Sequence, residues 1–104
     1  MRGEVWHAQF PGAIGPHPVL VLTVNAVSRR LSVLTVAVIA GTAGPPSTHV
    51  EVDSGAGLTG HDVSYVNVTD LHTLPKGKLR RRRGRLHPAE LVQVENAVRG
   101  YLGL

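Results

Sequence analysis

The chain has 104 residues, enough for one domain with a buried core and too few for two. It is 42% hydrophobic, 17% charged and 4% aromatic, and it has no cysteine, which excludes disulfides, thiolate metal sites and cysteine nucleophiles. Its formal charge is +4, and seven of its eleven Lys and Arg residues lie between Lys76 and Arg85.

The first two thirds of the chain predict short strands joined by turns rich in proline and glycine. Alternating side chains between Gly3 and Phe10 predict a first strand, which Pro11 and Gly12 would end. The apolar runs further along predict strands buried on both faces, and the segment before Asp53 alternates as a half-buried strand does. In all, strands are predicted over residues 3–10, 19–23, 31–39, 48–53 and 62–69. Turns or loops are predicted over residues 11–18, 25–30, 41–46 and 55–60.

The last part of the chain predicts a helix. Proline suits the first helical position, here Pro88, and Glu90 then lies in the first turn, where the helix dipole favours an anion. Apolar residues follow at helical spacing: Leu91, Val94, Val98, Tyr101 and Leu102. Gly103 marks the end of this helix. The elements together predict one mostly β domain over residues 1–104, with a curved antiparallel sheet or small barrel of five or six strands and a C-terminal helix.

Several classes of protein and site are not expected. The N-terminus lacks the charged and apolar regions of a signal peptide. The longest apolar run, near residues 31–40, is far shorter than the ~20 residues that span a membrane. We therefore expect a cytoplasmic protein with no membrane contact. Four histidines do not show the spacing of metal ligands, namely His49, His61, His72 and His87. We therefore expect no metal and no cofactor.

A series of segments resembles the MazF/PemK/Kid toxins. The opening GEVWHAQFPG, a short loop and then HPVLVLT is similar to that family's G-E-[IV]-[WY]…F-P…RP-[VA]-[LV]-V. The similarity continues through THVEVD, VNVTDLHTLPKGKL and GRLHPAELVQVENAVRGYLGL, in the expected order and over nearly the whole chain.

The resemblance implies an SH3-like barrel that forms a homodimer. It also implies a metal-independent endoribonuclease toxin that cuts single-stranded RNA at a short sequence, and a MazE-like antitoxin whose acidic, disordered tail covers the RNA groove. In such a reaction the ribose 2′-OH attacks the adjacent phosphorus, leaving a 2′,3′-cyclic phosphate and a 5′-OH. The site must take the 2′-OH proton, protonate the leaving oxygen and stabilise the developing oxyanion.

Both positions that usually carry the family's chemistry are altered. The family places an arginine before the proline that opens its second strand, and this chain has His17 before Pro18. The family's Thr or Ser at the end of the third strand aligns with Ala40. We expect His17 to transfer protons, since histidine titrates near neutral pH, and Thr42 to supply the hydroxyl if the strand end is bulged. Alternatively, His17 is an ordinary exposed histidine and Thr42 an ordinary turn residue.

Further RNA contacts are expected at four other positions. His7 shares a face of the first strand with Gln9, close to Trp6, and either contacts RNA or is a half-buried strand histidine. Trp6 either stacks a base or belongs to the core. Arg29 and Arg30 lie at a turn, where they contact RNA or antitoxin or are simply solvated. Ser64 matches a small polar residue near the start of the family's fifth strand.

The basic run from Lys76 to Arg85 predicts contact with a polyanion. A focused positive patch raises the local concentration of nucleic acid, and phosphates would relieve the repulsion among Arg80–Arg83. These contacts would position RNA without reading its sequence. Alternatively, the arginines are a solvated segment that pairs with Glu51, Asp53 or Glu95.

Two other functions remain open from the sequence. The altered positions are also those expected of a degenerate MazF-like barrel that binds nucleic acid or antitoxin without cutting. A CcdB-like poison of DNA gyrase shares the implied fold, although no C-terminal residue favours it.

Overall fold

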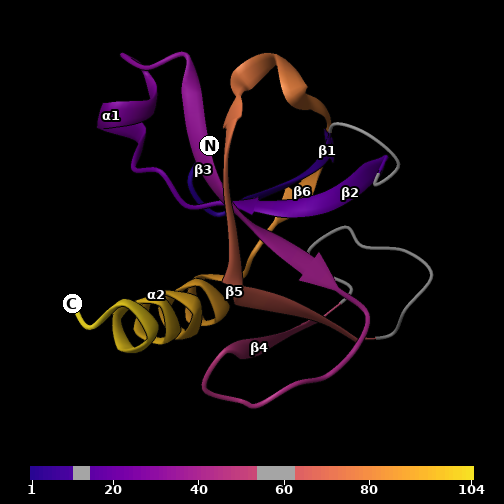
Figure 1. Cartoon of the computed structure of the whole chain (residues 1–104), viewed down its shortest axis with the longest axis vertical. Coiled ribbons are helices and arrows are strands. Elements are labelled where there is room, and N and C mark those ends of the chain that lie inside the picture. The colour runs from indigo at the N-terminus through magenta and orange to yellow at the C-terminus, as the bar shows by residue number, and fades with distance from the viewer. Residues whose placement is uncertain (11–14, 54–62) are drawn as a thin grey trace.

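The structure is a computed structural model that describes residues 1–10, 15–53 and 63–104. In these residues six strands form one antiparallel sheet in the order β4-β5-β3-β2-β1-β6, and the C-terminal helix α2 packs against β4 and β5 (Figure 1). The elements are β1 (Glu4–Gln9), β2 (Pro16–Val21), α1 (Asn25–Ser28), β3 (Val33–Ala40), β4 (His49–Asp53), β5 (Val63–Pro75), the 3-10 helix η3 (Lys76–Lys78), β6 (Leu79–Arg85) and α2 (Pro88–Leu102). The predicted mostly β fold with a C-terminal helix is confirmed.

Three predicted boundaries were wrong. β2 begins at Pro16, so residues 16–18 are strand and not loop; proline is tolerated as the first residue of a strand because no ladder donor is lost there. The turn predicted over residues 25–30 contains the short helix α1. β5 continues well beyond Thr69 to Pro75. The predictions at Pro11 and Gly12, at residues 55–60 and at the position before Val63 lie outside the described residues.

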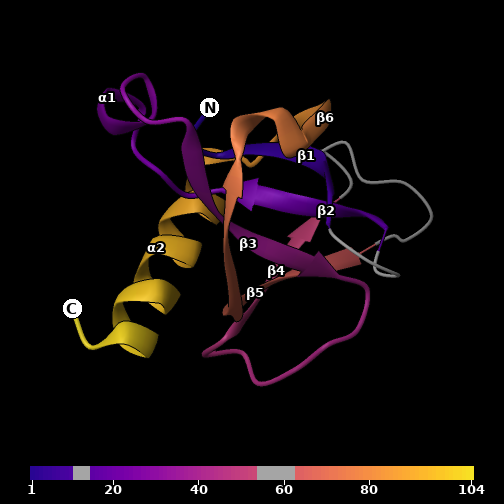
Figure 2. The same cartoon turned by 45° about the horizontal axis from the view of Figure 1, so that its top comes forward.

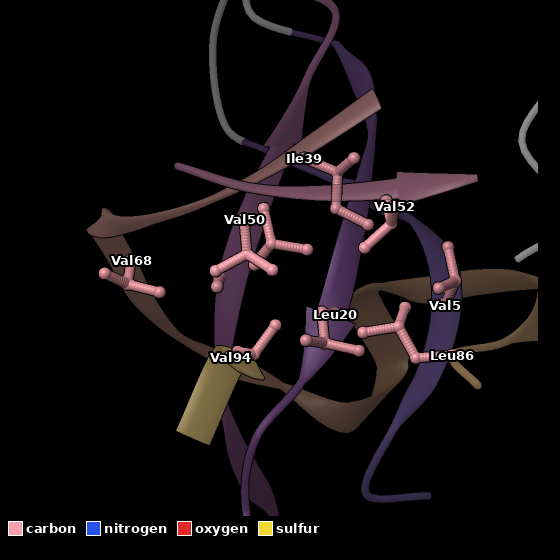
Figure 3. Packing of buried hydrophobic residues seen from close by; sticks show 10 residues of the cluster. Val5, Leu20, Ile39, Val50, Val52, Val68, Leu86 and Val94 are labelled. Carbon is pink, nitrogen blue, oxygen red and sulfur yellow. The ribbon is translucent and has the colours of Figure 1, made fainter. Parts of the chain in front are cut away.

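Buried side chains lie on both faces of the central strands and form two clusters. The helix-side cluster contains Val5, Leu20, Ala37, Ile39, Val50, Val52, Val66, Val68, Leu86 and Val94 (Figure 3). The hairpin-side cluster contains Ala8, Phe10, Val19, Val21, Leu34, Val36, Val38 and Leu74. Since successive residues of a strand face opposite sides, β2 and β3 contribute to both clusters. The prediction that these strands are buried on both faces is confirmed.

β5 bends in the middle, and its two parts belong to different halves of the sheet. Its pairing with β3 shifts between Ala37, opposite Leu71, and Val38, opposite Asn67. The residues between Asn67 and Leu71 are therefore extra on β5, as at a β-bulge, which bends the strand that carries it. The bend is visible where β5 leaves the level of β4 and rises to η3 (Figure 1). The Asn67 side chain holds it, because Oδ1 accepts hydrogen bonds from the Thr69 amide at 3.0 Å and hydroxyl at 2.6 Å.

The predicted helix is confirmed as α2, and a carboxylate ties its start to the sheet. Pro88 is its first residue, and Gly103 ends it in the left-handed conformation with φ 73°. One oxygen of Glu90 accepts a hydrogen bond from the His87 amide at 3.0 Å. The other accepts one from the Asp53 amide, also at 3.0 Å, so Glu90 joins α2 to the end of β4.

Replacing Glu90 with alanine should lower the free energy of unfolding by about 1 kcal/mol, because two backbone amides lose their acceptor and the first helical turn loses its anion. Urea denaturation followed by circular dichroism would measure the change. The control Gln93→Ala removes an exposed polar side chain from the same helix and should change stability by less than about 0.5 kcal/mol. Equal effects of the two variants would contradict the role given to Glu90.

Candidate active site

His17 lies in a row of side chains that crosses the sheet. It pairs with Ala8 of β1 on one side. On the other side β2 pairs with β3 through Val19–Val38 and Leu20–Ala37, and the same register carried to the start of β2 brings His17 opposite Ala40. Ala40 in turn pairs with Tyr65 of β5. Cross-strand partners share a face, so this row lies on the side of the hairpin-side cluster.

The register bears on where the two altered positions lie relative to each other. If the β2–β3 register continues past the Val19–Val38 pair, His17 and Ala40 are neighbours on adjacent strands. Thr42 is exposed and follows the end of β3 at Ala40. The register from Val38 to Ala40 is regular, so the described part of β3 has no bulge that would bring Thr42 into the row. A hydroxyl contribution from Thr42 stays a prediction.

A second histidine, His72, contacts the same phenyl ring as His17 and was not among the predicted site residues. The phenyl ring of Phe10 makes edge contacts with both imidazoles: its centre is 6.4 Å from that of His17 and 5.0 Å from that of His72. The Nε2 of His72 donates to the Oδ1 of Asp70 at 2.6 Å. The signal for this pair was present, since residues two apart on a strand share a face. The contact with Phe10 joins β1 to β5, which are not neighbours in the sheet.

His7 lies on the opposite face of β1 from this row. It follows Val5 of the helix-side cluster on the same face, and its cross-strand partners are Pro18 and Arg81. Burial lowers the pKa of His7 below its ordinary value, and the positive charges of Arg83 and Arg81 and the neighbouring His17 lower it further. The neutral imidazole is therefore favoured in the folded protein. A contact of His7 with RNA stays a prediction, on a different face from His17.

The lowered pKa of His7 predicts a loss of stability in acid. As the pH falls below about 6.5, the unfolded chain takes up a proton at His7 before the folded protein does. The free energy of unfolding should therefore fall as pH drops from about 7 to 5, and His7→Asn should flatten the dependence over that window. Urea denaturation across pH 5–8 measures both. Parallel curves for the wild type and His7→Asn would contradict the assignment.

Ser64 and Trp6 are less available to RNA than expected. Ser64 is only 5% exposed and pairs with Val52 of the helix-side cluster; its contact with RNA stays a prediction. Trp6 is half-buried against the hairpin-side cluster, and its indole N–H donates to Glu4 Oε1 at 3.2 Å. Of its two predicted roles, the structure favours the core.

Arg29 and Arg30 lie away from His17. They follow α1, which lies beyond the arrowhead of β2, whereas His17 is near the start of that strand (Figure 2). Both side chains are exposed. Arg29 borders a hollow of about 220 Å³ together with Lys76. The structure therefore does not bring these two arginines together with His17, and their contact with RNA or antitoxin stays a prediction.

The basic run is an edge strand with irregular pairing. β6 pairs only with β1 in the described sheet, and the register shifts twice, once at Arg83 and once at Arg80. Arg81 pairs with His7 and Arg82 with Trp6, so these neighbouring arginines face opposite sides of the sheet. The run is therefore a charged edge and not a single face.

Arg82 and Lys76 of the run contact groups within the protein that were not predicted as their partners. Arg82 Nε donates to Glu4 Oε2 at 2.9 Å, whereas Glu51, Asp53 or Glu95 had been expected. Glu95 instead pairs with Arg2. Lys76 donates to the Ser28 carbonyl at the end of α1. Burial raises the pKa of Glu4, but the Trp6 indole, the N-terminal amine and Arg82 outweigh it and hold that pKa below its ordinary value.

Glu4 therefore relieves part of the repulsion among these arginines without any phosphate. Glu4 and Arg82 are far apart in the sequence. A count of the charges between Lys76 and Arg85 could therefore not show their contact. Arg80 and Arg81 remain fully on the exposed edge, and they are the members of the run best placed to hold phosphate.

A hollow lies between α2, β4 and the segment before it. Its volume is about 1050 Å³. Tyr65, the partner of Ala40, lines one side of it, and Ala97 and Tyr101 of α2 line another. The hollow thus begins next to the row that contains His17.

Two further observations apply to the described residues alone. In residues 1–10, 15–53 and 63–104, the histidine and carboxylate side chains do not gather in groups of three that could hold a metal ion. The helices in the same ranges are too short or too polar to cross a membrane.

The chain is similar over its length to known toxins. The model of the family described as PemK-like, MazF-like toxin of type II toxin–antitoxin system matches residues 1–102. A curated relative, the probable endoribonuclease MazF2 of Mycobacterium tuberculosis, is 35% identical over 98% of this chain and 97% of its own.

Solved structures from mycobacteria have the same fold. An endoribonuclease in complex with its cognate antitoxin is 28% identical over 100% of this chain and 95% of its own, with a TM-score of 0.88. The Mycobacterium tuberculosis toxin MazF-mt6 is 30% identical over 97% of each chain, with a TM-score of 0.85.

Proposed function

The chain belongs to the PemK-like, MazF-like toxins of type II toxin–antitoxin systems, and on this premise we propose that it is an endoribonuclease that cuts single-stranded RNA at the row containing His17. The observation that carries the proposal is the register of β2 and β3. Carried from the Val19–Val38 pair to the start of β2, this register supports His17 and Ala40 as neighbours on one face, at the positions that would hold the family's arginine and Thr or Ser.

The proposed reaction needs no group beyond side chains and the RNA itself. The ribose 2′-OH attacks the adjacent phosphorus, and the bond to the 5′ oxygen of the next nucleotide breaks. His17 supplies a proton-transfer group, since an imidazole can take or give a proton near neutral pH. Arg80 and Arg81, exposed on the edge strand, hold backbone phosphates. Thr42 donates a hydroxyl hydrogen bond only if the segment after β3 moves toward the row.

The proposed partners follow from the family. A toxin of a type II system is held inactive by a cognate antitoxin, here of the MazE type with an acidic tail, and the exposed arginines of β6 offer a surface for its carboxylates. The protein acts as a homodimer in the cytoplasm.

One observation favours a second function. Ala40 has no hydroxyl, and Thr42 lies outside the row that contains His17. A barrel that has lost this group could bind RNA or antitoxin without cutting.

Cleavage of a long single-stranded RNA in the presence of EDTA tests the proposal. We expect fragments that carry a 2′,3′-cyclic phosphate at one end and a 5′-OH at the other, and these ends can be identified by their reactivity toward polynucleotide kinase. Intact RNA at every protein concentration, together with measurable binding, would favour the binding protein. Cleavage that EDTA abolishes would contradict the proposed chemistry.

A further inference from the structure

We propose that His72, oriented by Asp70, is the second proton-transfer group of the cleavage and acts as the general acid opposite His17. The inference rests on the proposed function. It names the second catalytic residue that is still needed when His17 and Ala40 occupy the family's two catalytic positions. It is carried by the juxtaposition of His17, Phe10, His72 and Asp70.

The bend of β5 brings His72 to this place. The extra residues between Asn67 and Leu71 change which side chains of β5 face each cluster. Leu71 packs toward the helix-side cluster, and the next residue, His72, lies on the other side of the strand beside Phe10. The cross-strand partner of His72 on β3 is the apolar Val36, so the charged and titratable groups facing it in the described residues are Asp70 and, across Phe10, His17.

The ring of Phe10 packs against both imidazoles. It is 4% exposed, and its ring meets that of His72 at 74° and that of His17 at 80°. The side chains of His72 and Asp70 are 38% and 46% exposed, so a substrate can reach them. In the described residues, neither nitrogen of His17 and only Nε2 of His72 has a hydrogen-bond partner. One phenyl ring therefore contacts two imidazoles, each of which keeps a nitrogen without a hydrogen-bond partner in the described residues.

A purely structural role explains this arrangement less well. An exposed ion pair contributes little to stability, because solvent screens it and both side chains lose freedom. The pair of Asp70 and His72 does, however, fix the imidazole. A carboxylate that accepts from Nε2–H sets the tautomer and orientation of the ring and leaves Nδ1 for a reacting group. Asp70 is thus a positioning residue.

The proton transfers balance with two histidines. His17 starts neutral and takes the proton of the 2′-OH as that oxygen forms its bond to phosphorus. In the proposed cycle His72 starts as the imidazolium, whose Nε2–H donates to the carboxylate of Asp70. As the bond from phosphorus to the 5′ oxygen breaks, the Nδ1–H of His72 gives its proton to that oxygen. The products are the 2′,3′-cyclic phosphate and the 5′-OH, and water returns both histidines to their starting forms.

A substrate whose leaving group needs no proton tests the role of His72. An oligonucleotide containing the site that the wild type cuts is made with either the natural 5′ oxygen or a bridging 5′ sulfur. On the oxygen substrate, His72→Ala should be about 10²–10³-fold slower than wild type. On the sulfur substrate it should approach the wild-type rate, because a thiolate leaves without protonation. His17→Ala should stay slow on both.

Asp70 and the neighbouring Thr73 complete the experiment. Asp70→Asn should slow cleavage of the oxygen substrate with little change in KM and approach the wild-type rate on the sulfur substrate, because His72 loses the carboxylate that orients its imidazole. Thr73→Ala changes an exposed residue of β5 next to His72 and should match wild type. Unfolding temperatures establish that the variants fold, and His72→Asn replaces His72→Ala if the latter does not.

The possible failures differ. An active wild type with an equally active His72→Ala overturns the inference alone, as does an equal loss of rate on both substrates. A wild type that leaves both RNAs intact overturns the proposed function, and this inference with it.

Discussion

Replacing His17 with alanine should lower the rate of RNA cleavage by about 10²–10⁴-fold, the usual contribution of a positioned acid or base. The expectation rests on its place in the row with Ala40 and on its edge contact with Phe10. The folded structure should persist, because His17 is only half-buried near the start of β2 and forms no hydrogen bond in the described residues. Initial rates on a labelled oligonucleotide, at saturating protein, measure the effect.

Two further variants serve as comparisons for His17→Ala. His49→Ala removes a histidine from the edge strand β4 and should cut at the wild-type rate. Thr42→Ala tests the segment after β3, and an effect smaller than that of His17→Ala is expected because Thr42 lies outside the row. If His17→Ala retains full activity, the row that contains it is not the place of the reaction.

Much of the fold could be predicted because side-chain periodicity reports burial directly. The alternation before Asp53 matches β4, and the helical spacing after Pro88 matches α2. The wrong predictions concern segments whose residue composition favours a loop but whose pairing with another strand makes them strands. A segment rich in proline and glycine suggests a loop, yet β2 begins at Pro16 because the first position of a strand needs no donor. An arginine run suggests a solvated segment, yet pairing with β1 makes it β6.

The site was only partly predictable, for a different physical reason. His17 was found through an aligned position, and the register then supplied its neighbours. His72 was missed because its contact with Phe10 depends on the bend of β5, which no periodicity shows. Ser64 was proposed from an aligned position, and the register then directs it toward the helix-side cluster. Contacts between strands that are distant in the sequence depend on strand pairing and on the curvature of the sheet. Neither can be deduced from a single sequence.

The charge of β6 leads to the other large effect. Replacing Arg80 and Arg81 together with glutamine should reduce the slope of log K against log salt by about 1.4, because each phosphate contact on a single strand contributes about 0.7. Binding should then be about 25-fold weaker at 0.1 M salt if the two proteins bind equally at 1 M. Fluorescence anisotropy with a 2′-O-methyl RNA, which has no attacking hydroxyl, measures binding without cleavage.

Arg82→Gln is the matched control, because it removes one charge from the same strand. Its guanidinium already bonds Glu4, so its loss should leave the salt slope close to that of the wild type and act mainly on stability. An unchanged slope for the double variant would show that the exposed edge does not hold phosphate. An equal reduction in Arg82→Gln would instead show that RNA displaces Glu4 from Arg82. The second result would make the whole run a phosphate-binding strand, with Glu4 as the group that neutralises one of its arginines while no RNA is bound.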